Sequence, residues 1–214
     1  MKAIDLMVFD FDGTLVSSGE DIATSVNLML QELGLEVLER EKVIGFVGDG
    51  VIKLIERVLG EEHRDLLDRA LKKFKDLYAE HLLDTTGLYP GVGEILQHFH
   101  DKRKVILTNK NYAFTMKIAW ALGLEAHFDD IIAGDSTPYF KPDPRLIQSL
   151  MERFRADAYR TAVIGDSTHD ILLARNAGAV SCAFLNGLVP RDTLLELKPD
   201  YTYERITELR SYFK

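Results

Sequence analysis

The chain of 214 residues contains a single cysteine, Cys182, which excludes a fold held together by internal disulfides. Cys182 lies in the apolar run 180–185, so we expect a buried, inert thiol and a reducing compartment. Long apolar runs are also missing, and no stretch approaches the roughly 18 residues of a membrane span. The N-terminal residues show no charged region followed by an apolar segment and a small-residue cleavage site. We therefore expect a cytoplasmic protein.

Positively charged residues are in the minority among the charged residues. The 26 lysines and arginines are outnumbered by 34 acidic residues, which gives a formal net charge of −8 at pH 7. Because a negative surface repels nucleic acids and anionic membranes, we expect neither as a partner. A small anionic substrate remains possible, since a metal ion and a few local cations can reverse the field inside one cleft. The six histidines form no metal-ligand set, and there is no low-complexity segment or internal repeat.

The most informative stretch is the apolar run 6–9, which ends abruptly in Asp10 and Asp12, followed by Gly13 and Thr14. The run lacks helical spacing and therefore predicts a buried strand. If the chain stays extended, the alternation of a strand places both carboxylates on one side, where they repel unless a cation or a proton separates them. This arrangement costs stability and so indicates a functional site.

Three further apolar runs, at 104–107, 130–133 and 162–164, lead into polar side chains in the same way. These side chains are Thr108, Asn109, Lys110, Lys141, Asp166 and Asp170. In parallel α/β sheets, ligands bind beyond the carboxyl ends of the strands. We therefore expect these side chains to converge on one site.

Helical periodicity dominates the residues after Leu15. The sets 22–33, 51–59 and 66–82 each place apolar residues on one face, with no convincing strand among them. Ser18, with Asp21 three residues later, predicts a capping box, and Gly34 predicts the end of that helix. This pattern predicts a helical unit inserted after the first strand.

From residue 88 onward, apolar strands alternate with helices near 93–102, 112–122, 144–154 and 168–176, and a further helix follows Arg191. The alternation predicts a doubly wound, Rossmann-like parallel sheet. We thus predict an α/β fold with a core domain of 1–14 and 87–214 and an inserted α-helical cap domain of 15–86.

The motifs, in their order, resemble those of the haloacid dehalogenase superfamily of phosphohydrolases across nearly the whole chain. They are Asp-x-Asp-Gly-Thr at 10–14, the strand-end Thr108, the downstream Lys141 and Gly-Asp-x-x-x-Asp at 165–170. The resemblance implies a helical cap at the position of the insertion. It also implies Mg²⁺-dependent hydrolysis of a phosphomonoester through an aspartyl-phosphate. Phe140 is a departure, because many relatives carry a second basic residue directly before the lysine.

The resemblance implies a role for each matching residue. Asp10 would be the nucleophile, Asp12 the general acid and base, and Thr108 a donor to a phosphoryl oxygen. Lys141 would offset the negative charge of the phosphate. Thr14 and Asn109 would complete the substrate-binding residues.

Mg²⁺ would be held by oxygen atoms alone, as it prefers. By resemblance the ligands are the carboxylates of Asp10 and Asp166 and the backbone carbonyl of Asp12. Asp170 would hold a metal-bound water or orient Lys141.

The loop Gly48-Asp49-Gly50 precedes a predicted helix, where free backbone N–H groups and the positive helix end can bind a substrate's carboxylate. Together with 89–92 and Asn109-Lys110, this loop is similar to those of phosphoglycolate phosphatases, whose substrate carries a phosphate and a carboxylate. Ser17 replaces an acidic residue frequent in that branch. We expect a small phosphorylated metabolite as the partner, 2-phosphoglycolate first, and a monomer or homodimer.

Several alternatives stay open. Within the family, a pyrophosphatase or a sugar-phosphate phosphatase resembling β-phosphoglucomutase is compatible with the motifs, although no histidine occurs between Asp12 and His63 to serve as the mutase base. A signalling receiver domain would carry its phosphorylated aspartate on the third strand and would lack the cap. A regulator that binds phosphate without turnover has no need of Asp12 as an acid.

Overall fold

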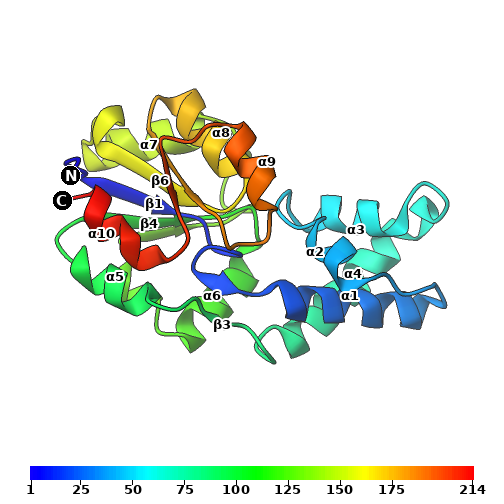
Figure 1. Cartoon of the computed structure of the whole chain (residues 1–214). Coiled ribbons are helices and arrows are strands. Elements are labelled where there is room, and N and C mark those ends of the chain that lie inside the picture. Colours follow the sequence, from blue (N-terminus) through cyan, green and yellow to red (C-terminus); the bar gives the residue numbers. More distant parts are fainter.

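The apolar run at the N-terminus forms strand β1 (Leu6–Phe9), which lies in the middle of a six-stranded sheet (Figure 1). The computed structural model describes all residues, 1–214. The strand order is β5-β4-β1-β6-β7-β8, and every neighbouring pair is parallel. The other strands are β4 (Arg103–Leu107), β5 (Asp130–Ile132), β6 (Thr161–Gly165), β7 (Val180–Phe184) and β8 (Tyr201–Tyr203).

Helices cover both faces of this sheet, and the alternate residues of β1 are therefore buried on opposite sides. Leu6 and Val8 belong to a core cluster with α7 (Arg145–Phe154) and α8 (Thr168–Ala177). Met7 and Phe9 belong to a larger cluster on the other face. On this face of the sheet the helices that contribute to it are α5 (Val92–His98), α6 (Tyr112–Ala121) and α10 (Leu209–Tyr212), and the cluster continues into the helices of residues 19–81. The prediction of a doubly wound parallel sheet is therefore confirmed.

The strand order reverses beside β1, and this places a crevice at the carboxyl ends. After β1 the core continues through β4 and β5 on one side, whereas β6 leads to β7 and β8 on the other. Chain segments that leave neighbouring strands in opposite directions open a crevice between them. Asp10 follows β1 and Asp166 follows β6, so both lie where this topology places a ligand.

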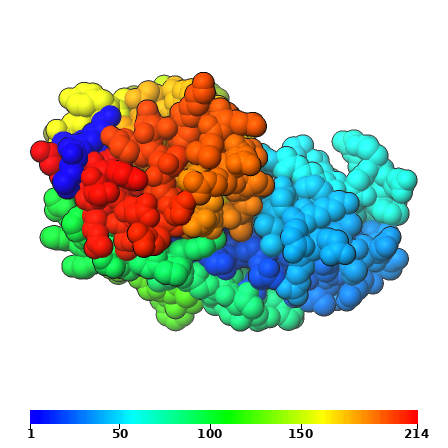
Figure 2. Space-filling model, in the orientation of Figure 1, coloured from blue at the N-terminus to red at the C-terminus, as the bar shows by residue number.

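Four helices gather beyond that end of the sheet (Figure 1). They are α1 (Gly19–Leu33), α2 (Arg40–Ile44), α3 (Val51–Leu59) and α4 (Leu67–His81). Their blue and cyan atoms form a lobe beside the core in Figure 2. The predicted division into 1–14 with 87–214 and 15–86 stays a prediction, and we refer to α1–α4 as the cap helices.

Two short strands connect the cap helices to the sheet. β2 (Val16–Ser17) pairs antiparallel with β3 (Gly87–Leu88), so the chain enters and leaves the cap helices side by side. The remaining elements are α9 (Arg191–Glu196) and four short 3-10 helices at Arg64–Leu66, Glu125–His127, Ala158–Arg160 and Ile206–Glu208. No helix of the chain combines the length and the apolar character that crossing a membrane requires.

Two local predictions are wrong, and two are confirmed. Ser18 makes no side-chain cap, because its hydroxyl donates to Asp12 and Asp21 binds another segment, so the predicted capping box does not form. The helix predicted over 93–102 ends at His98, after which the buried Phe99 turns the chain into β4. Gly34 ends α1 as predicted, with φ 73°, and Cys182 is buried in β7, where burial raises the pKa of its thiol.

Asp21 holds the two connecting segments together. Its buried carboxylate accepts hydrogen bonds of 2.6 to 3.0 Å from the backbone N–H and hydroxyl groups of Thr85 and Thr86, just before β3. Burial raises the pKa of Asp21, but these hydrogen bonds outweigh that effect, and the pKa lies below its usual 3.8. Since the folded pKa is depressed, this stabilisation is complete above the unfolded pKa and is lost as the pH falls through the folded pKa.

We expect Asp21→Asn to lower the free energy of unfolding by about 3 kcal/mol at neutral pH, because an amide nitrogen then faces buried N–H and O–H donors. Urea unfolding measures the change. Asp68→Asn, an exposed carboxylate in the first turn of α4, is the matched control and should change the value by less than about 1 kcal/mol. Equal stability of the two variants would show that Asp21 does not hold the connection.

Candidate active site

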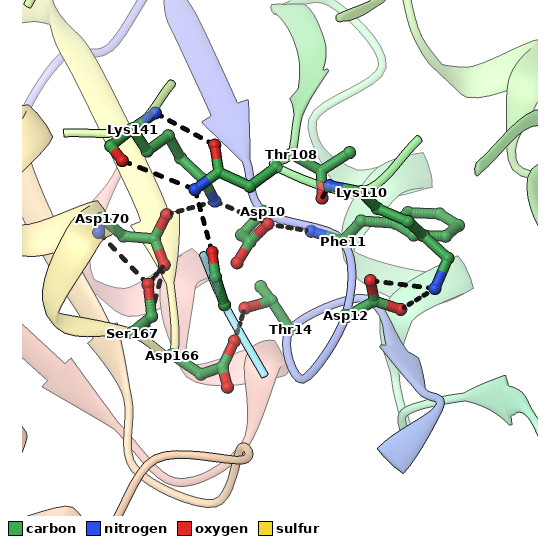
Figure 3. Close-up of polar contacts among 12 residues, drawn as sticks. Asp10, Phe11, Asp12, Thr14, Thr108, Lys110, Lys141, Asp166, Ser167 and Asp170 are labelled. Atoms are coloured by element: carbon green, nitrogen blue, oxygen red, sulfur yellow. Dashed lines mark hydrogen bonds and ion pairs between the residues drawn. The ribbon is translucent and has the colours of Figure 1, made fainter. Parts of the chain in front are cut away.

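Four strand ends supply the polar side chains of one cleft, as the sequence predicts (Figure 3). Asp10 follows β1, Thr108 follows β4, Lys141 lies in the loop after β5, and Asp166 follows β6. The structure brings Asp10, Lys141 and Asp166 together with Asp170, from the first turn of α8. Residues more than 150 positions apart therefore share one site, as the 2.7 Å hydrogen bond from Thr14 Oγ1 to Asp166 Oδ1 illustrates.

Lys141 occupies the centre of this group. Its Nζ lies 2.7 Å from Asp10 Oδ1 and 2.7 Å from Asp170 Oδ1, and all three side chains are buried. Burial lowers the pKa of Lys141, but the charges of Asp10 and Asp170 outweigh it, and the net pKa is raised. Ser167 fixes Asp170 through a capping box at the start of α8, with its hydroxyl 2.6 Å from Asp170 Oδ2. The lysine is therefore held charged in one position.

The three carboxylates carry more negative charge than Lys141 balances. Asp10, Asp166 and Asp170 each place an oxygen within 4.8 Å of the others. Burial, reinforced by the charge of Asp170, raises the pKa of Asp10 well above 3.8. Burial raises the pKa of Asp166 to about 7, against the hydrogen bond from Thr14. Buried, mutually repelling carboxylate oxygens are the donor set that suits a hard divalent cation, and the residues therefore fit Mg²⁺.

Gly13 makes room for this acidic group. Its φ of +84° favours glycine, and a Cβ built there would lie 2.1 Å from Asp166 Oδ2. The backbone of the Asp-x-Asp-Gly-Thr turn thus passes directly against the second acidic residue of the cluster. A side chain at Gly13 would displace Asp166.

Asp12 does not share a side with Asp10, because the chain does not stay extended as that expectation required. β1 ends at Phe9, so the alternation of the strand does not extend to Asp12. The Asp12 carboxylate turns away from Asp10 (Figure 3). It accepts a 2.5 Å hydrogen bond from Ser18 Oγ and lies 3.0 and 3.1 Å from Lys110 Nζ.

Lys110 lies at the site on which the strand-end side chains were expected to converge, although the sequence assigned it no individual role. Its Nζ donates to Tyr78 OH at 2.6 Å and lies 4.6 Å from the centre of that ring. Tyr78 belongs to α4, so Lys110 links Asp12 to the cap helices. Burial raises the pKa of Tyr78 to about 12, and the hydroxyl therefore stays neutral at physiological pH. The position of Lys110 in Thr-Asn-Lys after a strand predicted that it lies at the site, but not its contacts with Asp12 and Tyr78.

Asn109 and Thr108 support the floor of the cleft. Asn109 Oδ1 accepts from the backbone N–H of Lys141 at 3.0 Å, and its Nδ2 donates to the carbonyl of Gly48 at 2.9 Å. Thr108 Oγ1 accepts from the backbone N–H of Lys110 at 3.2 Å, which leaves its own hydrogen available to a ligand. Asn109 therefore holds both Lys141 and the loop Gly48-Asp49-Gly50, which we call the cap loop.

The cap loop lies at the cleft, and its Asp49 side chain contacts protein residues there. Gly48 and Gly50 line the cleft. The Asp49 side chain lies 2.7 Å from His169 Nε2 and also pairs with Arg57. His169, in the first turn of α8, thus bridges α8 to the cap loop. Donation from the loop's N–H groups to a substrate stays a prediction.

The cleft combines a charged floor with an apolar wall. The floor carries the acidic residues, the two lysines and the strand-end amide and hydroxyl groups described above. The wall comes largely from the cap helices and from loops beside them. Its apolar members are Ile22, Val47, Val51, Leu54, Phe74, Phe114, Leu188 and Val189. A charged floor beneath an apolar wall suits a small anionic molecule.

Known proteins resemble this chain over its full length. Residues 7–184 match the model of the haloacid dehalogenase-like hydrolase family. A phosphoglycolate phosphatase of Vibrio parahaemolyticus is 33% identical over 215 residues, covering 96% of this chain and 94% of that protein. One of Chromobacterium violaceum is 34% identical over 221 residues, covering 100% and 98%. The crystal structure of a predicted phosphoglycolate phosphatase from Haemophilus somnus superposes with a TM-score of 0.92 at 26% identity, covering 99% of each chain.

Proposed function

Because the chain belongs to the haloacid dehalogenase-like hydrolase family, we propose that it is a Mg²⁺-dependent phosphatase acting on a small phosphomonoester, with 2-phosphoglycolate as the preferred substrate. The observation that carries the proposal is the buried Lys141 held between Asp10 and Asp170 beside Asp166. The relatives named phosphoglycolate phosphatase support this substrate, since they align with the chain from end to end.

Asp10 is the nucleophile in this mechanism. One carboxylate oxygen forms a bond to phosphorus as the ester P–O bond breaks, which gives an aspartyl-phosphate and an alcohol; water then releases phosphate and restores Asp10. The 2.7 Å hydrogen bond from the backbone N–H of Phe11 to Asp10 Oδ1 fixes the orientation of the carboxylate. Lys141 offsets the repulsion between the carboxylate and the phosphate.

Asp12 gives a proton to the leaving oxygen and later takes one from the attacking water. Thr108 donates its free hydroxyl hydrogen to a phosphoryl oxygen. Thr14 orients Asp166 through its 2.7 Å hydrogen bond, and Asn109 holds the backbone of Lys141.

The carboxylates of Asp10 and Asp166 and the backbone carbonyl of Asp12 would hold Mg²⁺, which when bound neutralises charge on the phosphoryl group. For Asp170 the 2.7 Å contact with Lys141 supports the orienting role over the holding of a water.

The test is phosphate release from 2-phosphoglycolate, pyrophosphate, a sugar phosphate and a generic aryl phosphate, each with Mg²⁺ and with chelator. We expect a preference of about a hundredfold for 2-phosphoglycolate, roughly 2.7 kcal/mol in transition-state binding, and loss of turnover in chelator. Preference for pyrophosphate or for the sugar phosphate would favour the corresponding alternative within the family. Phosphate binding without turnover of any ester would favour the regulator, and activity unchanged by chelator would contradict the metal site.

A further inference from the structure

Lys110 and Lys141 are the only basic residues that line the cleft. Asp10 and Asp170 hold Lys141 beside the proposed nucleophile, where the phosphate group would bind. Lys110 lies on the side of the cap helices, with its side chain only 8% exposed. A buried cation outside the phosphate chemistry calls for a ligand or a structural role of its own.

The Lys110–Tyr78 pair has a hydrogen-bond donor that is not used, the hydroxyl group of Tyr78. The Tyr78 oxygen accepts from Lys110 at 2.6 Å, and no hydrogen bond of the structure uses the hydroxyl hydrogen of Tyr78. The Tyr78 ring packs against Phe74, at 5.4 Å between ring centres, and against Phe114 at 5.0 Å. In these apolar surroundings, an ammonium with a neighbouring hydroxyl binds an anion more strongly than it would in water.

The carboxylate partner of Lys110 is Asp12, which the proposed mechanism requires at the leaving oxygen. Asp12 contacts Lys110 through both carboxylate oxygens, at 3.0 and 3.1 Å, and also accepts from Ser18. To reach the leaving oxygen of a substrate, the Asp12 carboxylate must give up Lys110. That move leaves a buried cation without a partner unless another anion replaces Asp12.

We infer that Lys110 and Tyr78 bind a carboxylate group of the substrate, and that this carboxylate replaces Asp12 on Lys110 and frees Asp12 for the leaving oxygen. The inference rests on the proposed function and deepens it. The substrate class is a small phosphomonoester with a carboxylate beyond the ester oxygen. Its carboxylate is recognised here rather than at the Gly48-Asp49-Gly50 loop, because a buried ammonium and an unused hydroxyl hydrogen lie side by side at Lys110 and Tyr78.

The experiment compares 2-phosphoglycolate with 2-hydroxyethyl phosphate, in which an alcohol replaces the carboxylate, for wild type and Lys110→Met. We expect Lys110→Met to lose a factor of about 100 in kcat/KM on 2-phosphoglycolate. On 2-hydroxyethyl phosphate we expect kcat to stay the same or rise, because Asp12 is no longer held by Lys110. An equal loss on both esters would overturn the inference, since Lys110 would then only position Asp12. An unchanged preference for 2-phosphoglycolate would overturn it as well.

Three further variants support the comparison. Lys117→Met removes a lysine of α6 that donates only to the Ala79 carbonyl, and it should leave both rates unchanged. Lys110→Arg keeps the charge and should restore part of the preference. Tyr78→Phe removes one donor and should cost about tenfold on 2-phosphoglycolate alone. If thermal unfolding shows that Lys110→Met does not fold, Tyr78→Phe decides: a loss on both esters or on neither overturns the inference.

Failure of the inference and failure of the proposed function give different results. Wild type that hydrolyses neither ester contradicts the proposed function, and the inference falls with it. Wild type that prefers 2-phosphoglycolate, with a preference that Lys110→Met retains, contradicts the inference alone.

Discussion

Replacement of Asp10 by asparagine is expected to abolish turnover, with a loss of at least about 10⁴ in kcat, or roughly 5.5 kcal/mol. The amide keeps the shape of the side chain but cannot form the aspartyl-phosphate. Phosphate release measures the loss, and intact mass after acid quench should show a phosphorylated wild type and an unmodified variant. Asp192→Asn, at an exposed position in the first turn of α9, is the matched control and should keep full activity.

Folding should survive the Asp10→Asn change. Burial raises the pKa of Asp10 well above 3.8. The free energy of unfolding of the wild type therefore falls as the pH rises above the unfolded pKa, because the buried carboxylate is then less stable in its ionised form than it is in the unfolded chain. In chelator at neutral pH, the variant should therefore unfold at the same or a higher temperature. Activity like that of wild type in a clean preparation would refute the nucleophile assignment.

Replacement of Lys141 by methionine is expected to lower kcat by about 10³ or more, because the phosphate dianion then meets Asp10 without a compensating protein cation. Phe140 cannot substitute for it, although it occupies the position where many relatives carry a second basic residue. Phosphate release on 2-phosphoglycolate with Mg²⁺ measures the loss. Lys141→Arg, which keeps the charge in a tightly packed position, should retain more activity than Lys141→Met.

The same variant is expected to lose stability when no metal is present. Asp10 and Asp170 lose the partner that lies 2.7 Å from each, at a cost of about 3–5 kcal/mol in the free energy of unfolding. Mg²⁺ should recover more stability in Lys141→Met than in wild type, since it meets less balanced negative charge. Urea unfolding with Mg²⁺ and with chelator measures both values. Equal stability of variant and wild type in chelator would contradict the charge balance described for this site.

The sequence predicted the sheet and its functional end because both depend on local patterns. The run Leu6–Phe9 is apolar on both faces, as a central parallel strand must be. Asp10, Thr108 and Asp166 each follow such a run directly, so their convergence required only the rule that parallel strands end at one edge. Gly34 at the end of α1 followed from its own conformational freedom.

The sequence did not predict the partners that depend on how the cap helices pack. Ser18 and Asp21 have the spacing of a capping box, but tertiary hydrogen bonds to Asp12 and to Thr85 outweigh that local preference. The Lys110–Tyr78 and His169–Asp49 contacts join segments 32 and 120 positions apart (110 − 78 and 169 − 49). Neither spacing carries a signal, because only the packed structure brings these pairs together.

The ribbon of β2 and β3 has an evolutionary consequence. Val16 pairs with Leu88 and Ser17 with Gly87, so the chain returns to the sheet beside the point at which it left. A gene could therefore lose, lengthen or exchange everything between these two pairs without altering the path of any strand of the sheet. Replacing that one contiguous segment would change Tyr78 and Ser18, the partners of Lys110 and Asp12, while the strand ends that carry Lys110 and Asp12 keep their places. One scaffold can thus acquire new substrates through a change confined to the inserted helices.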